Sequence, residues 1–171
     1  MSVYEMKSSV EKDQVLILER VFDAPRELVF QMFKDPEHLK HWWGPSGWEL
    51  PVCNVDFRPG GSWHYCMKCI DQNQGEFYGM ESWGKAVYHE INEPEMFSYT
   101  DYFSDADANV DESLPSSDIT LEFIEMDGMT KLVSRAEYQS PEALKTVMDM
   151  GMLQGITETW DRLEKHLNEI K

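Results

Sequence analysis

The sequence is short of basic residues and of long apolar runs, and each shortage excludes a class of protein. Fifteen Lys and Arg residues stand against 32 Asp and Glu residues, which gives a formal net charge of −17. A field of this sign repels phosphate backbones, so we expect neither nucleic acid nor an anionic membrane surface as a partner. No stretch reaches the roughly 18 apolar residues of a membrane span, so we expect no membrane insertion.

Cysteine and the usual catalytic signatures are also scarce. The three cysteines, an odd number, fit a reducing compartment better than a disulfide framework. The first residues lack the basic start and the apolar run of a signal peptide, and we therefore expect a cytoplasmic location. No phosphate-binding glycine loop, dinucleotide fingerprint or nucleophile elbow is present, and the five histidines are scattered. We assign no catalytic residue and expect no cofactor.

Apolar residues, by contrast, are plentiful. The 171-residue chain is 42 % hydrophobic and 12 % aromatic, which suits one domain with a sizeable core. Residues 1–13 are polar, and we expect them to form an N-terminal extension that is either a loose end or an added edge segment. Residues 14–171 then form the single domain.

The periodicity of the sequence predicts strands and helices in a definite order. Residues 15–22 form a β-rich run, and Asp23-Ala24-Pro25 and Asp35-Pro36 each start a short helix after it. Six further strands are expected in close succession, which favours an antiparallel meander. They span residues 48–57, 62–70, 77–90, 97–103, 119–125 and 131–138.

A long amphipathic helix is predicted at the C-terminal end. Ser140-Pro141-Glu142 combines a hydroxyl cap, a proline and an acid in the first turn, and apolar residues then recur every three or four positions to about residue 168. Its apolar face needs a partner, and the sheet is the only large one available. We therefore predict an α+β fold, in which a curved antiparallel sheet of about six to seven strands wraps around this helix, with two short helices after the first strand.

The order of these motifs resembles a known family. Residues 14–168 are similar to the birch-pollen-allergen-like, START-related superfamily (SRPBCC, the helix-grip fold). Within it, they resemble the family named after the C-terminal domain of the activator of heat-shock-protein-90 ATPase. The matching segments are Phe22-Asp23-Ala24-Pro25, Val29-Phe30, Asp35-Pro36, Trp42-Trp43, residues 56–61, 97–100 and 130–132, and residues 155–167 with Trp160 and Leu163.

The resemblance implies a function as well as a fold. It implies a cavity between sheet and helix that binds a small hydrophobic or amphipathic molecule, which is the leading interpretation. A chaperone-accessory role, with a chaperone as partner, is the alternative that the family name implies. A third is a cyclase- or hydrolase-type enzyme that uses a cavity acid or histidine.

Aromatic and methionine side chains are the candidate lining of such a cavity. Small-molecule sites are commonly aromatic, and six tryptophans exceed what the packing of one small domain requires. The alternative for each residue is an ordinary place in the core. The candidates are Trp43, Trp63, Trp83, Phe97, Tyr99, Phe123, Met148 and Met152.

Asp101 is the candidate polar group of the cavity. Strand alternation places it on the same side as Phe97 and Tyr99, which are expected to point inward. A buried carboxylate needs a partner or a raised pKa, and Arg135 and His64 are conceivable partners. Asp101 would then be a polar anchor or a general base. Alternatively, a bulge or a strand end exposes it.

Two glycines interrupt the last helix. Gly151 and Gly155 are four residues apart and share one side of the predicted helix. Each costs about 0.5–1 kcal/mol relative to alanine, so we expect a compensating role. Close approach of a strand is favoured, and room for a ligand is the alternative.

No metal site is expected. Cys66 and Cys69 resemble half of a zinc site, but a second pair of ligands is missing, and on a strand the two thiols point to opposite faces. Residues 105–112 resemble the start of a calcium loop, but Val110 and Ser116 replace the required glycine and glutamate.

Overall fold

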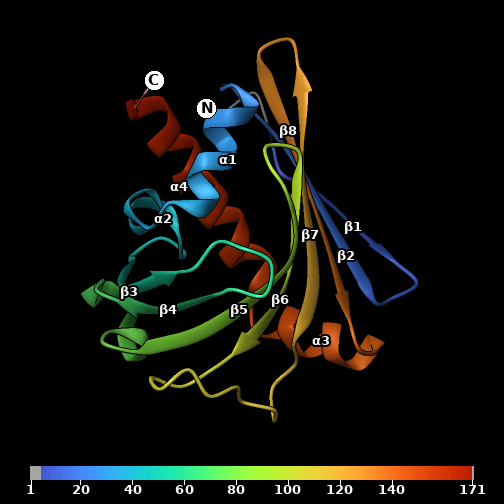
Figure 1. The fold of residues 1–171 in the computed structure, drawn as a ribbon. Helices are drawn as coiled ribbons and strands as arrows, with labels where there is room; N and C mark the ends of the chain where they lie inside the picture. The colour runs from blue at the N-terminus through green and yellow to red at the C-terminus, as the bar shows by residue number, and fades with distance from the viewer. Residues whose placement is uncertain (1–4, 171) are drawn as a thin grey trace.

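A single antiparallel sheet is the frame of the molecule. The computed structural model describes residues 5–170, and eight strands form one sheet in the order β1-β2-β8-β7-β6-β5-β4-β3 (Figure 1). Seven of them correspond to the predicted strands, and the α+β helix-grip prediction is confirmed. The strands are β1 (Lys7–Glu11), β2 (Val15–Phe22), β3 (Trp48–Val55), β4 (Ser62–Cys69), β5 (Glu81–Asn92), β6 (Met96–Phe103), β7 (Ser117–Met126) and β8 (Met129–Tyr138).

Four α-helices accompany the sheet. They are α1 (Arg26–Lys34), α2 (Pro36–Trp42), α3 (Pro141–Asp149) and α4 (Met152–Ile170), with a short 3₁₀ segment η1 at Gln72–Phe77. Figure 1 shows α4 lying across the curved sheet, with α1 and α2 beside its C-terminal part. No helix within residues 5–170 combines the length and the apolar character that crossing a bilayer requires.

The two short helices form where the sequence supplies their starts. Pro25 immediately precedes α1, and the Asp35 side chain accepts a hydrogen bond from the Glu37 backbone N–H at 2.9 Å, which caps α2. Phe30 and Phe33 of α1 point into the core, where the Phe30 ring lies 4.9 Å from that of Phe123 on β7. The helices thus fill one end of the concave face.

The N-terminal segment belongs to the sheet. Lys7–Glu11 pairs antiparallel with β2 as the edge strand β1, so the added edge segment is the correct alternative for these residues. This pairing raises the number of strands to eight. The rest of the predicted extension includes residues 1–4, which lie outside the described part of the chain.

The prediction of one continuous C-terminal helix is wrong. Ser140 caps the first helix as expected, accepting from the Ala143 N–H at 3.1 Å, but α3 ends at Asp149 and a second helix begins at Met152. Gly151 between them has φ +86°, a left-handed conformation that glycine adopts without a Cβ penalty. A smaller correction concerns β5, which begins at Glu81 rather than Phe77, because η1 extends to Phe77 and a turn follows it.

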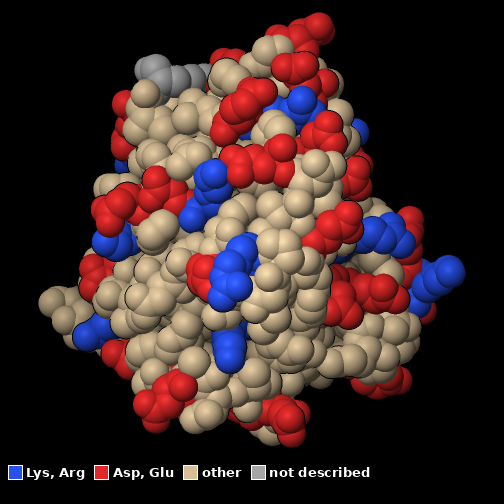
Figure 2. Space-filling view, viewed as in Figure 1, with Lys and Arg blue, Asp and Glu red and all other residues tan. Residues whose placement is uncertain are grey.

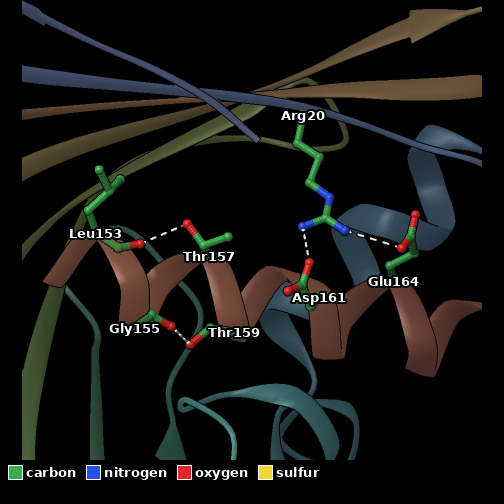
Figure 3. Close-up of polar contacts among 7 residues, drawn as sticks. All are labelled: Arg20, Leu153, Gly155, Thr157, Thr159, Asp161 and Glu164. Carbon is green, nitrogen blue, oxygen red and sulfur yellow. Dashed lines mark hydrogen bonds and ion pairs between the residues drawn. The ribbon is translucent and has the colours of Figure 1, made fainter. Parts of the chain in front are cut away.

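Two arginines fasten α4. Arg20 of β2 is 3 % exposed, and its two terminal nitrogens pair with Asp161 at 2.7 Å and Glu164 at 3.1 Å (Figure 3). Arg162 of α4 donates to the carbonyls of Gly44 and Trp48 at 2.8 and 3.0 Å. These contacts hold α4 to β2, to the start of β3 and to the loop after α2.

Candidate ligand-binding cavity

A cavity of about 350 Å³ lies between the sheet and the junction of α3 with α4. Its walls come from β2 and β4–β8, the loop after α2 and the inner sides of the two helices, and they are predominantly apolar. The aromatic residues that line it are Phe33, Trp43, Tyr65, Trp83, Tyr99, Tyr102, Phe103, Tyr138 and Trp160.

The structure brings together only part of the predicted lining. Trp43, Tyr99, Asp101 and Met152 line the cavity. Trp83 is also part of the wall, but its ring stacks on that of His64, with 5.2 Å between ring centroids, and points away from the cavity. The other candidates, Trp63, Phe97, Phe123 and Met148, do not line it; all four belong to the core or pack against it.

Packing by neighbouring aromatic side chains explains the excluded residues. Phe97 and Phe123 are covered by α1, whose Phe30 ring lies 5.7 Å from Phe97. Trp63 lies behind Trp43 and Tyr65, with ring centroids 4.6 and 4.5 Å away. Sequence alternation identified the inward face of each strand, but not which part of that face the helices occupy.

Asp101 points into the cavity, and its partner is a tyrosine. The Tyr65 hydroxyl donates a hydrogen bond to Asp101 Oδ1 at 3.2 Å. The expectation of Arg135 or His64 as partner is wrong, because both lie on the outer face of the sheet by strand alternation. Arg135 pairs there with Glu11 at 2.9 Å, and His64 contacts the Asp105 carbonyl at 2.9 Å. The alternative of an exposed strand end is also wrong.

The contact between Tyr65 and Asp101 crosses an intervening strand. Tyr65 on β4 is opposite Gly84 on β5, and Asp101 on β6 is opposite Ala86 on β5. A Cβ on Gly84 would collide with the ring and the hydroxyl of Tyr65. Glycine at position 84 therefore lets the tyrosine lie flat over β5 and reach the carboxylate.

The surroundings of Asp101 favour its neutral form. Burial away from bulk water raises the pKa of Asp101 to about 7, and the hydrogen bond from Tyr65 opposes this shift only in part. Burial, together with the Asp101 charge, also raises the pKa of Tyr65 and Tyr99 well above the usual value. These hydroxyls remain donors at any physiological pH.

Gly155 leaves open space at the cavity wall. It lines the cavity, and a Cβ built on Gly155 or Gly151 meets no atom within 4 Å. The favoured expectation of close strand packing is therefore wrong for both glycines, and room beside the helix is what the structure provides. The Thr159 hydroxyl bonds the Gly155 carbonyl at 2.8 Å, so it is already engaged within α4 (Figure 3).

The two motifs resembling metal sites have structural explanations. Cys66 and Cys69 are buried free thiols on β4. Asp105 uses its carboxylate to accept the backbone N–H groups of Asp107 and Asn109, each at 2.9 Å, which organises the loop itself. Among residues 5–170 no group of three His, Cys, Asp or Glu side chains is arranged to hold a metal ion.

A family model confirms the resemblance that the sequence motifs indicated. The model described as "Activator of Hsp90 ATPase homolog 1-like protein" matches residues 23–168. The chain belongs to this family. No curated protein matches it.

Several solved structures of bacterial proteins are similar to this member of the Hsp90 ATPase activator homolog 1-like family. Protein Ms6760 from Mycobacterium smegmatis is 31% identical with a TM-score of 0.82, and the match covers 93% of this chain and 94% of that one. A Staphylococcus epidermidis protein is 29% identical with a TM-score of 0.80, covering 96% and 94%. An Arthrobacter aurescens protein, at 22% identity and a TM-score of 0.85 over 95% and 91%, shares the fold.

Sequence reasoning missed several residues of the cavity wall in this family member, and two of them, Tyr65 and Gly84, set the position of Asp101. Tyr65 and Gly84 both line the cavity, and neither was a candidate. An isolated glycine inside a strand is a known sign of close approach by another group, so Gly84 carried a usable signal. The hydrogen bond between Tyr65 and Asp101 left no signal in the sequence, because it depends on the register of three strands.

Proposed function

We propose that this protein binds a small hydrophobic or amphipathic molecule in the cavity between the sheet and the α3–α4 helices. The observation that carries the proposal is an apolar cavity of about 350 Å³ with a single carboxyl group in its wall. Protein interiors normally contain few voids larger than a water molecule, so a space of this size is not a packing defect. Ligand pockets typically span about 300–1,000 Å³ and combine apolar walls with a few polar groups.

The residues proposed to contact the ligand come from several elements. Trp43 supplies aromatic surface, and Tyr99, Met152 and Asp101 complete the set from the predicted candidates. The break at Gly151 and the missing side chain at Gly155 leave the room that a ligand needs. A chaperone partner and an enzymatic activity stay predictions, since neither rests on a contact among the described residues.

A cavity-filling variant tests the proposal. Gly155→Phe places a ring in the open space without left-handed backbone strain. The matched control is Gln154→Phe, which adds the same ring one residue away at an exposed position. The probe is N-phenyl-1-naphthylamine, a neutral fluorophore that brightens in apolar surroundings.

The expected result is saturable binding to the unmodified protein and to Gln154→Phe, and affinity reduced about tenfold or more in Gly155→Phe. Circular dichroism establishes that the three proteins are equally folded. Absence of saturable binding to the unmodified protein, or unchanged affinity in a folded Gly155→Phe, would overturn the proposal. If the expected result is obtained, native mass spectrometry of protein purified from its own cells would identify any retained molecule.

A further inference from the structure

Resting on the proposed binding function, we infer that the ligand is a hydrophobic amine, and that its cationic nitrogen pairs with the Asp101 carboxylate. The inference rests on the charges of the cavity wall, the aromatic groups around the acid, the unused acceptor positions of Asp101 and the charge of the whole protein.

The cavity wall carries an acid and no base. Asp101 is the one carboxylate among the described lining residues, and none of those residues is Lys, Arg or His. Two cations on neighbouring segments are engaged elsewhere: Arg162 donates to the Gly44 carbonyl at 2.8 Å, and Lys85 donates to the Ala108 carbonyl at 3.4 Å. A carboxylate ligand such as a fatty acid would meet a like charge without a counter-ion, whereas an amine would meet its opposite charge.

The aromatic rings of the cavity wall also favour a cationic ligand. Trp43, Tyr65, Tyr99 and Trp160 all line the same cavity as Asp101. A cationic nitrogen over an aromatic face is attracted by the ring quadrupole, and more strongly where water is excluded. Sites that recognise alkylammonium groups use aromatic rings in this way.

Asp101 has acceptor capacity to spare. Among the described residues, its side chain has one hydrogen-bond partner, the Tyr65 hydroxyl at 3.2 Å from Oδ1. An ionised carboxylate offers about four acceptor positions, so most remain open to a donor in the cavity. Because Tyr65 holds one oxygen, the carboxylate is oriented before the ligand arrives.

The surface of the protein also favours a cation. The net charge is −17, and Figure 2 shows acidic side chains spread over the face that it draws, with fewer basic ones among them. Such a field raises the local concentration of cations and lowers that of anions. The surface charge therefore favours a cationic ligand, as the cavity wall does.

Binding should depend on pH through Asp101. Burial raises its pKa to about 7, and a cation would lower this pKa again, so binding releases a proton. The groups that face Asp101 are Tyr65 from β4, Tyr88 from β5, Tyr99 from β6, Ser117 from β7 and Tyr138 from β8, while α4 presents the uncharged Gly155 and Thr159. None of these groups changes charge between pH 5.5 and 8, so amine affinity should rise across this range.

Three probes of equal chain length test the inference by calorimetry: decylamine, decan-1-ol and sodium decanoate. Asp101→Asn removes the carboxylate, and Glu122→Gln, at an exposed position on β7, removes one negative charge outside the cavity. At pH 8 we expect decylamine to bind about 10- to 100-fold more tightly than decan-1-ol, as charge-assisted hydrogen bonds allow, and decanoate to bind most weakly.

The variants separate recognition from general attraction. We expect Asp101→Asn to lose at least about tenfold in decylamine affinity and little in decan-1-ol affinity, while Glu122→Gln behaves like the unmodified protein. Equal affinities for the three probes would overturn the inference and leave the proposed function standing. Loss of alcohol and amine binding together in Asp101→Asn would also overturn it. If no probe binds the unmodified protein, the proposed function itself fails.

Discussion

The hydroxyl of Tyr65 on β4 reaches the carboxylate of Asp101 on β6 by crossing the strand that separates them. The crossing depends on Gly84 of β5, over which the tyrosine ring lies. A hydrogen bond that joins two non-neighbouring strands therefore orients the one carboxylate of the described cavity wall. Several consequences of this arrangement, and of the way α4 is held, are measurable.

Replacement of Gly84 should disturb the crossing. In Gly84→Ala the new methyl group collides with the Tyr65 ring, and we expect a loss of about 1–3 kcal/mol in the free energy of unfolding, as for other overpacked sites. Tyr65→Leu removes the ring, so the double variant should lose less than the sum of the single variants. Urea denaturation measures all four proteins. Strict additivity would contradict the proposed contact.

Asp101 should lower stability at alkaline pH. Its pKa is about 7 in the folded protein and 3.8 for an aspartate side chain exposed to water, so the folded state binds the extra proton between these values. Stability therefore falls as the pH rises from about 4 to 7, and the full penalty, up to about 4 kcal/mol, is present above pH 7. Asp101→Asn should be stabilised relative to the unmodified protein at pH 8 far more than at pH 4. Thermal unfolding of both checks the difference, and Glu122→Gln is the control for removal of a negative charge outside the cavity.

Replacement of the two glycines near the helix junction by alanine should change the stability of the protein in opposite directions. Gly155 has helical backbone angles and open space, so Gly155→Ala should stabilise by about 0.5–1 kcal/mol. Gly151 has φ +86°, so Gly151→Ala should destabilise by about 1–2 kcal/mol. Each variant is the control for the other in chemical denaturation. A stabilising Gly151→Ala would mean that the break between α3 and α4 is not fixed by this residue.

Loss of the two carboxylate partners of the buried Arg20 should destabilise the fold more than replacement of Arg20 itself. Asp161→Asn with Glu164→Gln leaves the Arg20 guanidinium, 3 % exposed, without the two carboxylates that pair with it, and we expect a cost of roughly 3 kcal/mol or more. Arg20→Met removes the cation and leaves two carboxylates that face solvent in part, so it should cost less. Equilibrium unfolding in urea ranks the variants. The reverse order would show that the packing of Arg20, including its position over Phe22, outweighs its charge.

His166 should weaken the fold at acidic pH. It is buried on α4, lies 3.0 Å from His38 between ring nitrogens, and stacks on His41 at 4.8 Å between ring centroids. Burial first, and then the two neighbouring histidines, lower its pKa, so the unfolded chain binds a proton that the folded protein does not. Stability should decrease as the pH falls below about 6.5. His166→Gln should show a smaller decrease in melting temperature between pH 7.5 and 5.5, and an equal decrease would contradict the interpretation.

The sequence predicted the frame of the molecule well, because local chemistry determines it. The proline-led starts of α1 and α2, the Ser140 cap of α3 and the strand alternation from residue 48 to 138 all correspond to observed elements. The break between α3 and α4 was not predicted, since the apolar spacing of three or four residues continues past Gly151 and gives no sign of its left-handed φ. The junction that opens the cavity was therefore missing from the prediction.

The predictions for the candidate site succeeded and failed for the same reason as those for the fold. Sequence alternation alone placed Tyr99 and Asp101 on the inner face of β6, because side chains alternate with a period of two whatever the rest of the chain does. Only the tertiary structure decided that α1 covers Phe97 and Phe123 while Asp101 stays open to the cavity, and that Tyr65 rather than Arg135 is its partner. Those outcomes depend on strand register and helix placement, which join residues far apart in the chain.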